Sequence, residues 1–241
     1  MHNTKKIESV APLSNVVSFD SLIRDFMASH TDRPRLGVFS GLTGVGKTQA
    51  AAFAVNEYDA YHVQVGYSWT KRFFCKAMMV EMGMLTWDDT PKGSLPDLVY
   101  AISLQLMRSR RILIVDDAQF LVQKSIIELI RDILEASKAL IILIGEETLP
   151  RELKKWSRIY NRVRKWGRAE PLNLADTMAL ARFVCKDLEI SKELLSEVCA
   201  SVNGCARTIV THLEHIQACA AAHPPTRVDP ATYTSRLDSG L

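Results

Sequence analysis

The sequence has 241 residues, of which 47% are apolar, and a formal net charge of only +3. A chain of this size can bury a substantial core and forms one large domain, or a main domain with a smaller one. No apolar run reaches the roughly 18 residues that a membrane span needs, and residues 1–8 lack the apolar stretch of a signal peptide. We therefore expect a cytoplasmic protein without a membrane partner.

Five cysteines are spread along the chain without a Cys-x-x-Cys pair: Cys75, Cys185, Cys199, Cys205 and Cys219. An odd number of cysteines in a cytoplasmic context predicts free thiols. It argues against a disulfide framework and against a zinc site.

The first quarter of the chain predicts a strand, a glycine-rich loop and a helix in succession. Residues 1–14 are expected to be a tail, and residues 19–29 an amphipathic helix. A short apolar run over residues 36–40 is typical of a buried strand, and residues 49–55 favour a helix. Between them lies the P-loop pattern, Gly41-Leu42-Thr43-Gly44-Val45-Gly46-Lys47-Thr48. Strand, loop and helix form the context in which this motif binds phosphate.

The residue types of the P-loop suit ATP and Mg²⁺. Gly41, Gly44 and Gly46 permit positive φ and close approach to an anion. The backbone N–H groups of the loop then surround the phosphates at a helix N-terminus. We expect Lys47 to reach the β- and γ-phosphates and the Thr48 hydroxyl to bind Mg²⁺. The predicted nucleotide-binding residues of this region are Gly41, Leu42, Thr43, Gly44, Val45, Gly46, Lys47, Thr48 and Gln49.

Strands and helices alternate over the next hundred residues. Strands are predicted at residues 61–65, 111–117 and 140–145, and helices at residues 69–82, 94–108 and 125–137. The apolar runs of the last two strands fit parallel strands buried on both faces. Together with phosphate chemistry at the carboxyl ends of strands, this order predicts a doubly wound α/β domain.

The pattern changes after residue 170. Residues 175–188, 191–202 and 206–221 predict three helices with no strand between them. We therefore divide the chain into an N-terminal tail (1–14), a P-loop α/β domain (15–170) and a helical lid domain with a C-terminal tail (171–241).

The strand that ends in Asp116 and Asp117 matches the Walker B pattern of four apolar residues followed by acids. We expect Asp116 to hold Mg²⁺, usually through water, and Asp117 to orient and activate the attacking water. The alternative is a pair of strand-end acids that caps the next loop.

A P-loop α/β domain followed by a helical lid resembles the AAA+ ATPases, over roughly residues 15–220. Asp116-Asp117-Ala118-Gln119 resembles the Asp-Glu-Ala-Gln of one branch. That branch includes the DNA-transposition ATPases related to the target-selection ATPase of phage Mu, and the ATPases of some secretion systems. Residues 141–149 resemble its sensor-1 strand, and Arg207 resembles its sensor-2 arginine, which reaches the nucleotide. The resemblance implies a bacterial cell or a phage-infected host.

The same resemblance implies an arginine finger that comes from a neighbouring subunit and therefore an oligomer, as a ring or a helical filament. Arg162 fits the family spacing best, and Arg158 is the next candidate; the alternative for each is a solvated or DNA-facing arginine. Asp117 stands where the family has Glu and is one methylene shorter, which implies slow hydrolysis. Glu146 stands where sensor 1 is usually neutral, and we expect no catalytic role for it.

Basic residues are concentrated in residues 151–168. This segment holds eight Lys and Arg residues against Glu152 alone, so it carries +7 and the rest of the chain −4. Such a stripe indicates an anionic partner or a charged subunit contact. In the transposition ATPases the helix start after the second strand contacts the DNA backbone. The resemblance thus implies DNA contacts here for Thr70, Lys71, Arg72 and Lys76; the alternative is a solvated helix face.

The leading hypothesis is an ATPase that contacts the sugar-phosphate backbone of duplex DNA. It assembles on the DNA and presents the DNA to a transposase. Two alternatives stay open. One is a replication-type loader ATPase with a helicase partner. The other is a nucleotide-gated module that signals to proteins without binding DNA, and steep salt dependence of DNA binding would argue against it.

Overall fold

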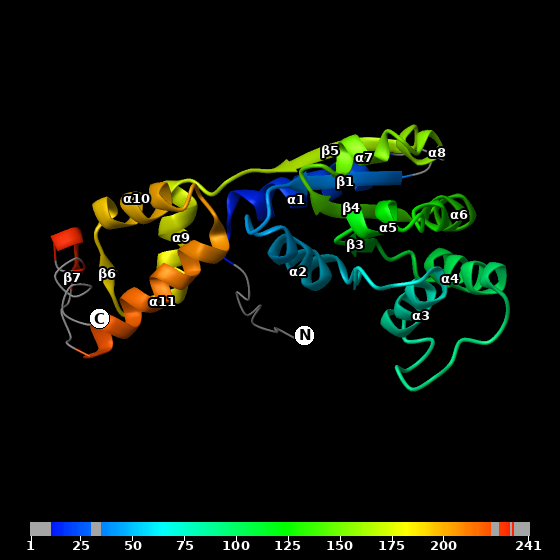
Figure 1. The fold of residues 1–241 in the computed structure, drawn as a ribbon, viewed down its shortest axis with the longest axis horizontal. Coiled ribbons are helices and arrows are strands. Elements are labelled where there is room, and N and C mark those ends of the chain that lie inside the picture. Colours follow the sequence, from blue (N-terminus) through cyan, green and yellow to red (C-terminus); the bar gives the residue numbers. More distant parts are fainter. Residues whose placement is uncertain (1–10, 30–34, 223–226, 232, 234–241) are drawn as a thin grey trace. The chain divides into compact units, whose positions relative to one another are not determined.

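Figure 1 shows the computed structural model of the chain, which describes residues 11–29, 35–222, 227–231 and 233. The contacts among these residues form two compact units. The sheet unit comprises residues 18–41 and 47–169. The helical unit comprises residues 11–17, residues 42–46 and the described residues from 170 onward. Most of the predicted tail lies outside the described residues, and the predicted domain boundaries stay a prediction.

The sheet unit is built on five parallel strands in the order β2-β3-β4-β1-β5. The strands are β1 (Arg35–Gly41), β2 (Tyr61–Gln64), β3 (Leu113–Asp116), β4 (Leu140–Glu146) and β5 (Val163–Ala169). All of β3 and all of β4 before Glu146 are buried, as expected for apolar strands covered on both faces. The predicted α/β fold with a parallel sheet is therefore confirmed.

Helices precede and separate these strands in the sheet unit (Figure 1). They are α1 (Ser14–Ala28, whose residues up to Val17 belong to the helical unit), α2 (Lys47–Tyr58), α3 (Lys71–Glu81), α4 (Leu95–Ser109), α5 (Gln119–Gln123), α6 (Glu128–Ser137), α7 (Leu149–Leu153) and α8 (Ser157–Tyr160). Helix α4 starts where the sequence predicts it, and its start is capped: Asp97 accepts hydrogen bonds from the N–H and hydroxyl of Ser94 at 2.7 and 2.6 Å. The short helix α5 was not expected.

Helix α1 begins at Ser14, five residues before the predicted start. The amphipathic helix predicted in this region is present, and Phe19 and Ile23 on its apolar face are fully buried. The ring of Phe19 lies 5.0 Å from that of Phe39 on β1, centroid to centroid. The helix is therefore anchored to the central part of the sheet.

Strand β5 is a second feature that the sequence did not reveal. Its residues alternate between exposed and half-buried positions before the buried Ala169. Arg164, Lys165 and Arg168 interrupt the apolar pattern from which a strand is usually predicted. The basic segment 151–168 thus spans two short helices and a strand.

The helical unit contains the three predicted helices, α9 (Leu174–Val184), α10 (Lys192–Ser201) and α11 (Ala206–Ala222). The expectation of no strand among them is wrong: β6 (Glu189–Ile190) lies between α9 and α10 and pairs in parallel with β7 (Arg227–Val228). Two residues are too few for a periodic signal, so the pairing depends on tertiary structure. None of the helices in the described ranges is both long and apolar enough to span a bilayer.

Candidate nucleotide-binding site

The two residues predicted to hold Mg²⁺ meet in the sheet unit. Thr48 lies in the first turn of α2, and Asp116 ends β3. The Thr48 hydroxyl donates a hydrogen bond to Oδ2 of Asp116 at 2.9 Å. A hydroxyl and a carboxylate are oxygen ligands of the kind that Mg²⁺ prefers. The residues present therefore fit the ion that the motifs imply.

Asp116 is ionised although it is only 2% exposed. Burial raises its pKa, but the imidazole of His62, the N–H of Asp117 and the Thr48 hydroxyl together outweigh burial and leave the pKa below its usual value. The His62 Nε2 atom lies 3.7 Å from Asp116 Oδ2, beyond hydrogen-bond distance. The site therefore presents a negative charge at neutral pH, which suits a cation.

Lys47 is folded back onto its own loop. Its Nζ donates a hydrogen bond to the carbonyl of Gly41 at 2.9 Å. Burial lowers the pKa of Lys47, while the charges of Asp116, Asp117, Glu146 and Glu147 oppose that shift. The ammonium group is thus partly desolvated near the Walker B acids, where a phosphate would replace lost solvation.

Asp117 has a backbone and side chain that are both tightly constrained. Its φ of 55° lies in the left-handed region, which is uncommon for a non-glycine residue. Its carboxylate accepts hydrogen bonds from Nε2 of Gln64 at 2.9 Å and from Nε2 of Gln119 at 3.2 Å. The Gln119 Oε1 in turn accepts a hydrogen bond from the N–H of Glu146 at 3.3 Å. One buried amide therefore links the candidate water-activating acid to the end of β4.

Sequence reasoning missed Gln64, Gln119 and His62 as members of this site. Gln64 pairs in register with Asp116 at the carboxyl ends of β2 and β3. Since the carboxyl ends of parallel strands meet at one edge of a sheet, a polar residue next to the end of the predicted strand 61–65 was a usable signal. Gln119 appeared only as part of a family motif, without a role.

The P-loop backbone from Leu42 to Gly46 packs within the helical unit. Gly44 and Gly46 have φ of 81° and 94°, as predicted. The N–H of Arg207 donates a hydrogen bond to the carbonyl of Gly44 at 3.1 Å. Arg207, which was expected to reach the nucleotide, thus contacts the P-loop through its backbone, and its role at the nucleotide stays a prediction.

Asn15 is a further residue at the P-loop that the sequence did not reveal. It is 3% exposed, and its Nδ2 donates to the carbonyls of Val45 and Glu170 at 2.9 and 2.7 Å. Its Oδ1 accepts from the N–H of Glu170 at 2.9 Å. The Asn15 side chain therefore holds the P-loop in place from the residue at which the α/β domain was expected to begin.

Gly41 differs from its prediction. It is the last residue of β1 and is not among the described glycines with positive φ. A side chain at this position would collide with the backbone of Ala169 on β5. Glycine is therefore needed here for close strand packing and not for a left-handed turn. Leu42, Thr43 and Gln49 are exposed, whereas Val45 is buried.

The two candidate arginine fingers have different surroundings. Arg162 forms an ion pair with Glu135 and donates to the carbonyl of Arg158. The side chain of Arg158, on α8, is exposed. Arg162 thus already has partners within its own subunit.

The predicted DNA contacts surround the start of α3. Thr70 caps the helix, since its hydroxyl oxygen accepts from the N–H of Phe73 at 3.2 Å. Arg72 donates to the carbonyls of Pro91 and Gly93, and Lys76 to that of Trp87 at 2.6 Å. Lys71 is exposed. The structure therefore gives Thr70, Arg72 and Lys76 a local structural role.

A parallel α/β sheet with a P-loop before α2 and paired acids after β3 defines a P-loop nucleotide-binding protein. A family model described as "AAA domain" matches residues 30–153, slightly more than half of the chain. The chain belongs to this family.

Solved structures share the fold. The ORC2 protein of Aeropyrum pernix matches with a TM-score of 0.68 and 11% identity, over 95% of this chain and 69% of that chain. The A. pernix ORC1 protein in complex with DNA has a TM-score of 0.63 and 15% identity, over 93% and 64%. The RuvB Holliday junction branch migration motor of Thermotoga maritima has a TM-score of 0.64 and 14% identity, over 94% and 70%. At these identities the likeness shows the AAA+ fold alone. No curated protein matches the sequence.

Proposed function

We propose that the chain is an ATPase of a DNA-transposition system. It binds ATP and Mg²⁺, assembles as an oligomer on duplex DNA without reading its sequence, and delivers that DNA to a transposase. The hydrogen bond between Thr48 and Asp116, 2.9 Å long, is the observation that carries the nucleotide part of this proposal. It joins the P-loop and the Walker B strand, which lie 68 residues apart.

Each residue has one role in this proposal. Thr48 and Asp116 hold Mg²⁺, which when bound would offset charge on the phosphates. Lys47 and the loop N–H groups bind the phosphates, and Arg207 contributes from the start of α11. Asp117 orients a water molecule and accepts its proton at a carboxylate oxygen. Arg158 or Arg162 of a neighbouring subunit provides positive charge for the transferred group.

Support for DNA as the partner comes from charge and from motif. The segment 151–168 carries +7, and Lys71 is exposed at the start of α3. Basic side chains bind the DNA backbone without base recognition. The ORC1 protein, which shares the fold, was solved in complex with DNA. The proposal that a transposase receives the DNA rests on the resemblance of Asp116-Asp117-Ala118-Gln119 to the motif of the transposition ATPases.

One observation favours a second function, a nucleotide-gated module that signals to proteins. Arg72 and Lys76 donate to carbonyls of the loop between α3 and α4, so they are less available to phosphates than the sequence implied. A replication-type loader remains a variant of the leading proposal with a different partner.

The test is DNA binding by the purified chain with ATP, with ADP and without nucleotide, on two unrelated duplexes and across a salt series. We expect tight binding only with ATP, equal on both duplexes and falling steeply with salt. Lys47→Ala should abolish the ATP-dependent part, whereas Lys186→Ala, at an exposed lysine of the helical unit, should leave it unchanged.

Two results would contradict the proposal. ATP-stimulated binding that survives Lys47→Ala would remove the nucleotide mechanism. Absence of DNA binding under every nucleotide condition, with ATP hydrolysis retained, would favour the signalling module.

A further inference from the structure

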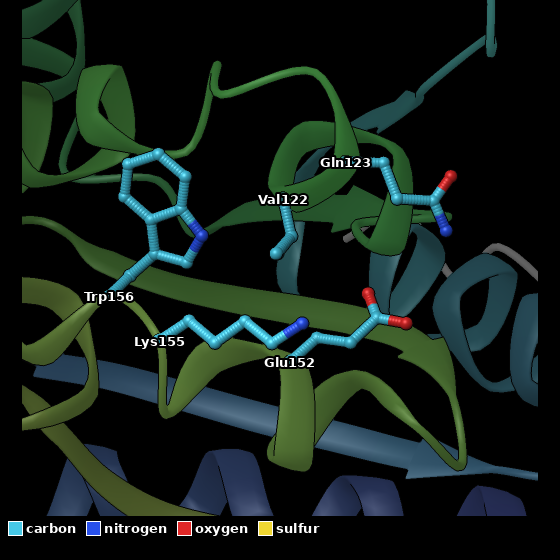
Figure 2. A pocket seen from close by; sticks show the side chains of 5 residues that line it. All are labelled: Val122, Gln123, Glu152, Lys155 and Trp156. Atoms are coloured by element: carbon cyan, nitrogen blue, oxygen red, sulfur yellow. The ribbon is translucent and has the colours of Figure 1, made fainter.

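An open pocket of about 460 Å³ lies on the sheet unit between α5 and the segment that includes α7. Val122 and Gln123 line it from α5, Glu152 from α7, and Lys155 and Trp156 from the turn after α7. Figure 2 shows the Trp156 indole toward one end of the pocket and the carboxylate of Glu152 toward the other. The pocket is distinct from the nucleotide-binding residues described above.

Glu152 gives the pocket an unsatisfied acceptor. Its Oε1 accepts a hydrogen bond from the Thr148 hydroxyl at 3.2 Å. Its Oε2 is shielded from solvent and has no hydrogen-bond partner among the residues that the structure describes. A shielded carboxylate oxygen is costly unless a donor, preferably a cation, approaches it. Lys155 also lines the pocket, but no ion pair joins it to Glu152 among the described residues, so Oε2 is left without a positively charged donor.

The rest of the pocket suits the apolar stem of a long side chain. Val122 is only 7% exposed, and Trp156 is partly buried against the core of the sheet unit. Arginine combines an apolar stem with a planar, weakly hydrated guanidinium that has several donors. Its stem would lie along Trp156 and Val122 while its head reaches Glu152.

The surroundings of the pocket restrict where such a cation can come from. Four exposed basic residues lie in this stretch: Arg151, Lys154, Lys155 and Arg158. They repel a free cation but attract a segment with acidic residues. The cation that reaches Glu152 must therefore arrive attached to negative charges.

We propose that this pocket is a docking site for a protein partner that inserts one arginine from an acidic segment. The arginine satisfies Oε2 of Glu152, and the flanking acids pair with the basic rim. This site requires neither DNA nor ATP, so it stands independently of the function proposed above.

The test uses the peptide Ac-Glu-Asp-Arg-Asp-Glu-NH₂ and its counterpart with citrulline, which keeps the shape of arginine without its charge. The indole N–H signals of the ¹⁵N-tryptophan-labelled full chain report binding, and Trp156→Phe assigns the signal of Trp156. We expect a saturable shift of the Trp156 signal with the arginine peptide. The dissociation constant should rise about tenfold or more when citrulline replaces arginine in the peptide, and also when Glu152→Gln replaces the unaltered chain. Unchanged signals from the other tryptophans would show that Glu152→Gln is folded.

Four comparisons test whether the proposal is wrong. Equal binding of the arginine and citrulline peptides, or no effect of Glu152→Gln, would overturn it. Nα-acetyl-arginine amide should bind more weakly than the peptide; equal affinity would indicate a small guanidinium compound as the ligand. Lys155→Met should weaken peptide binding a few-fold, and stronger binding would show that Lys155 itself is the partner of Glu152.

Discussion

The side-chain amide of Gln64 donates a hydrogen bond to the carboxylate of Asp117, with 2.9 Å between Nε2 and Oδ2. The two residues belong to neighbouring parts of the sheet, at the end of β2 and directly after β3. A hydrogen bond from a neighbouring amide holds a carboxylate in one orientation. Gln64 therefore restrains the residue that we propose as the water-activating group.

Gln64→Ala should raise the basal rate of ATP hydrolysis by about three- to tenfold, because the Asp117 carboxylate loses one hydrogen bond and becomes freer to turn towards the attacking water. Steady-state phosphate release measures this. Gln105→Ala serves as a control, since the Gln105 amide lies near the Tyr61 hydroxyl at 3.5 Å and not at the acids. An unchanged or lower rate in Gln64→Ala would show that this hydrogen bond does not restrain catalysis.

Asp117→Asn should leave ATP binding intact and stop hydrolysis, because an amide cannot accept the proton of the attacking water. The complex with ATP and DNA should then persist much longer than that of the unaltered chain. The dissociation rate of labelled DNA after dilution measures its lifetime. Loss of ATP binding in this variant would assign Asp117 to the binding of the nucleotide instead.

Arg158→Ala should lower ATP hydrolysis about 10³-fold without loss of ATP binding, as removal of an arginine finger does. Arg162→Ala should have a smaller effect on hydrolysis and lower the free energy of unfolding by about 1 kcal/mol or less, since its partly exposed ion pair with Glu135 is lost. Phosphate release and denaturant unfolding measure the two effects. The reverse ranking of hydrolysis rates would identify Arg162 as the finger.

Cys205 should be the cysteine that reacts fastest with iodoacetamide at pH 8. Hydrogen bonds from Thr208 lower the pKa of the Cys205 thiol, so more of it is thiolate at that pH. Burial raises the pKa of Cys75 to about 11, so that thiol stays protonated. Because Cys205 Sγ lies 3.8 Å from the carbonyl of Gly44, alkylation should also weaken ATP binding. Peptide mass spectrometry with and without ATP tests both points, and faster labelling of Cys75 would contradict the expectation.

Asn15→Ala should lower the free energy of unfolding by about 1–3 kcal/mol, because the buried hydrogen bond to the carbonyl of Val45 and the partly buried one to that of Glu170 are lost. ATP affinity should fall as well, since Val45 belongs to the P-loop. Asn15→Asp should be at least as harmful, because a carboxylate cannot donate to either carbonyl. Thermal unfolding and nucleotide titration measure these effects, and wild-type values in both assays would show that Asn15 does not support the loop.

The sequence was most informative where local signals agreed. The P-loop, the apolar strands β3 and β4 and the capped start of α4 all combine a strong local preference with a strong motif. The contact of Thr48 with Asp116 followed from these motifs, because the motifs occupy fixed places in a parallel sheet.

The remainder depended on long-range contacts that local patterns do not report. Strand β5 carries three basic residues and is stabilised by pairing with β1. The strands β6 and β7 have two residues each, and each is stabilised by pairing with the other. Asn15 acts through hydrogen bonds to residues 30 and 155 positions away, and nothing near it in the sequence indicates a role.

Strand β5 also bears on how copies of this chain can associate. Among the described residues it pairs with β1 and with no other strand, so its other side presents backbone groups that a further strand could join. Such open strands invite uncontrolled aggregation, and charged side chains along them discourage it. Arg164, Lys165 and Arg168 place charged side chains on this strand, one of them paired with Asp25, and such side chains oppose the pairing of two copies here. The oligomer that we propose is therefore expected to form through helices and loops, and the sheets of its subunits should remain separate.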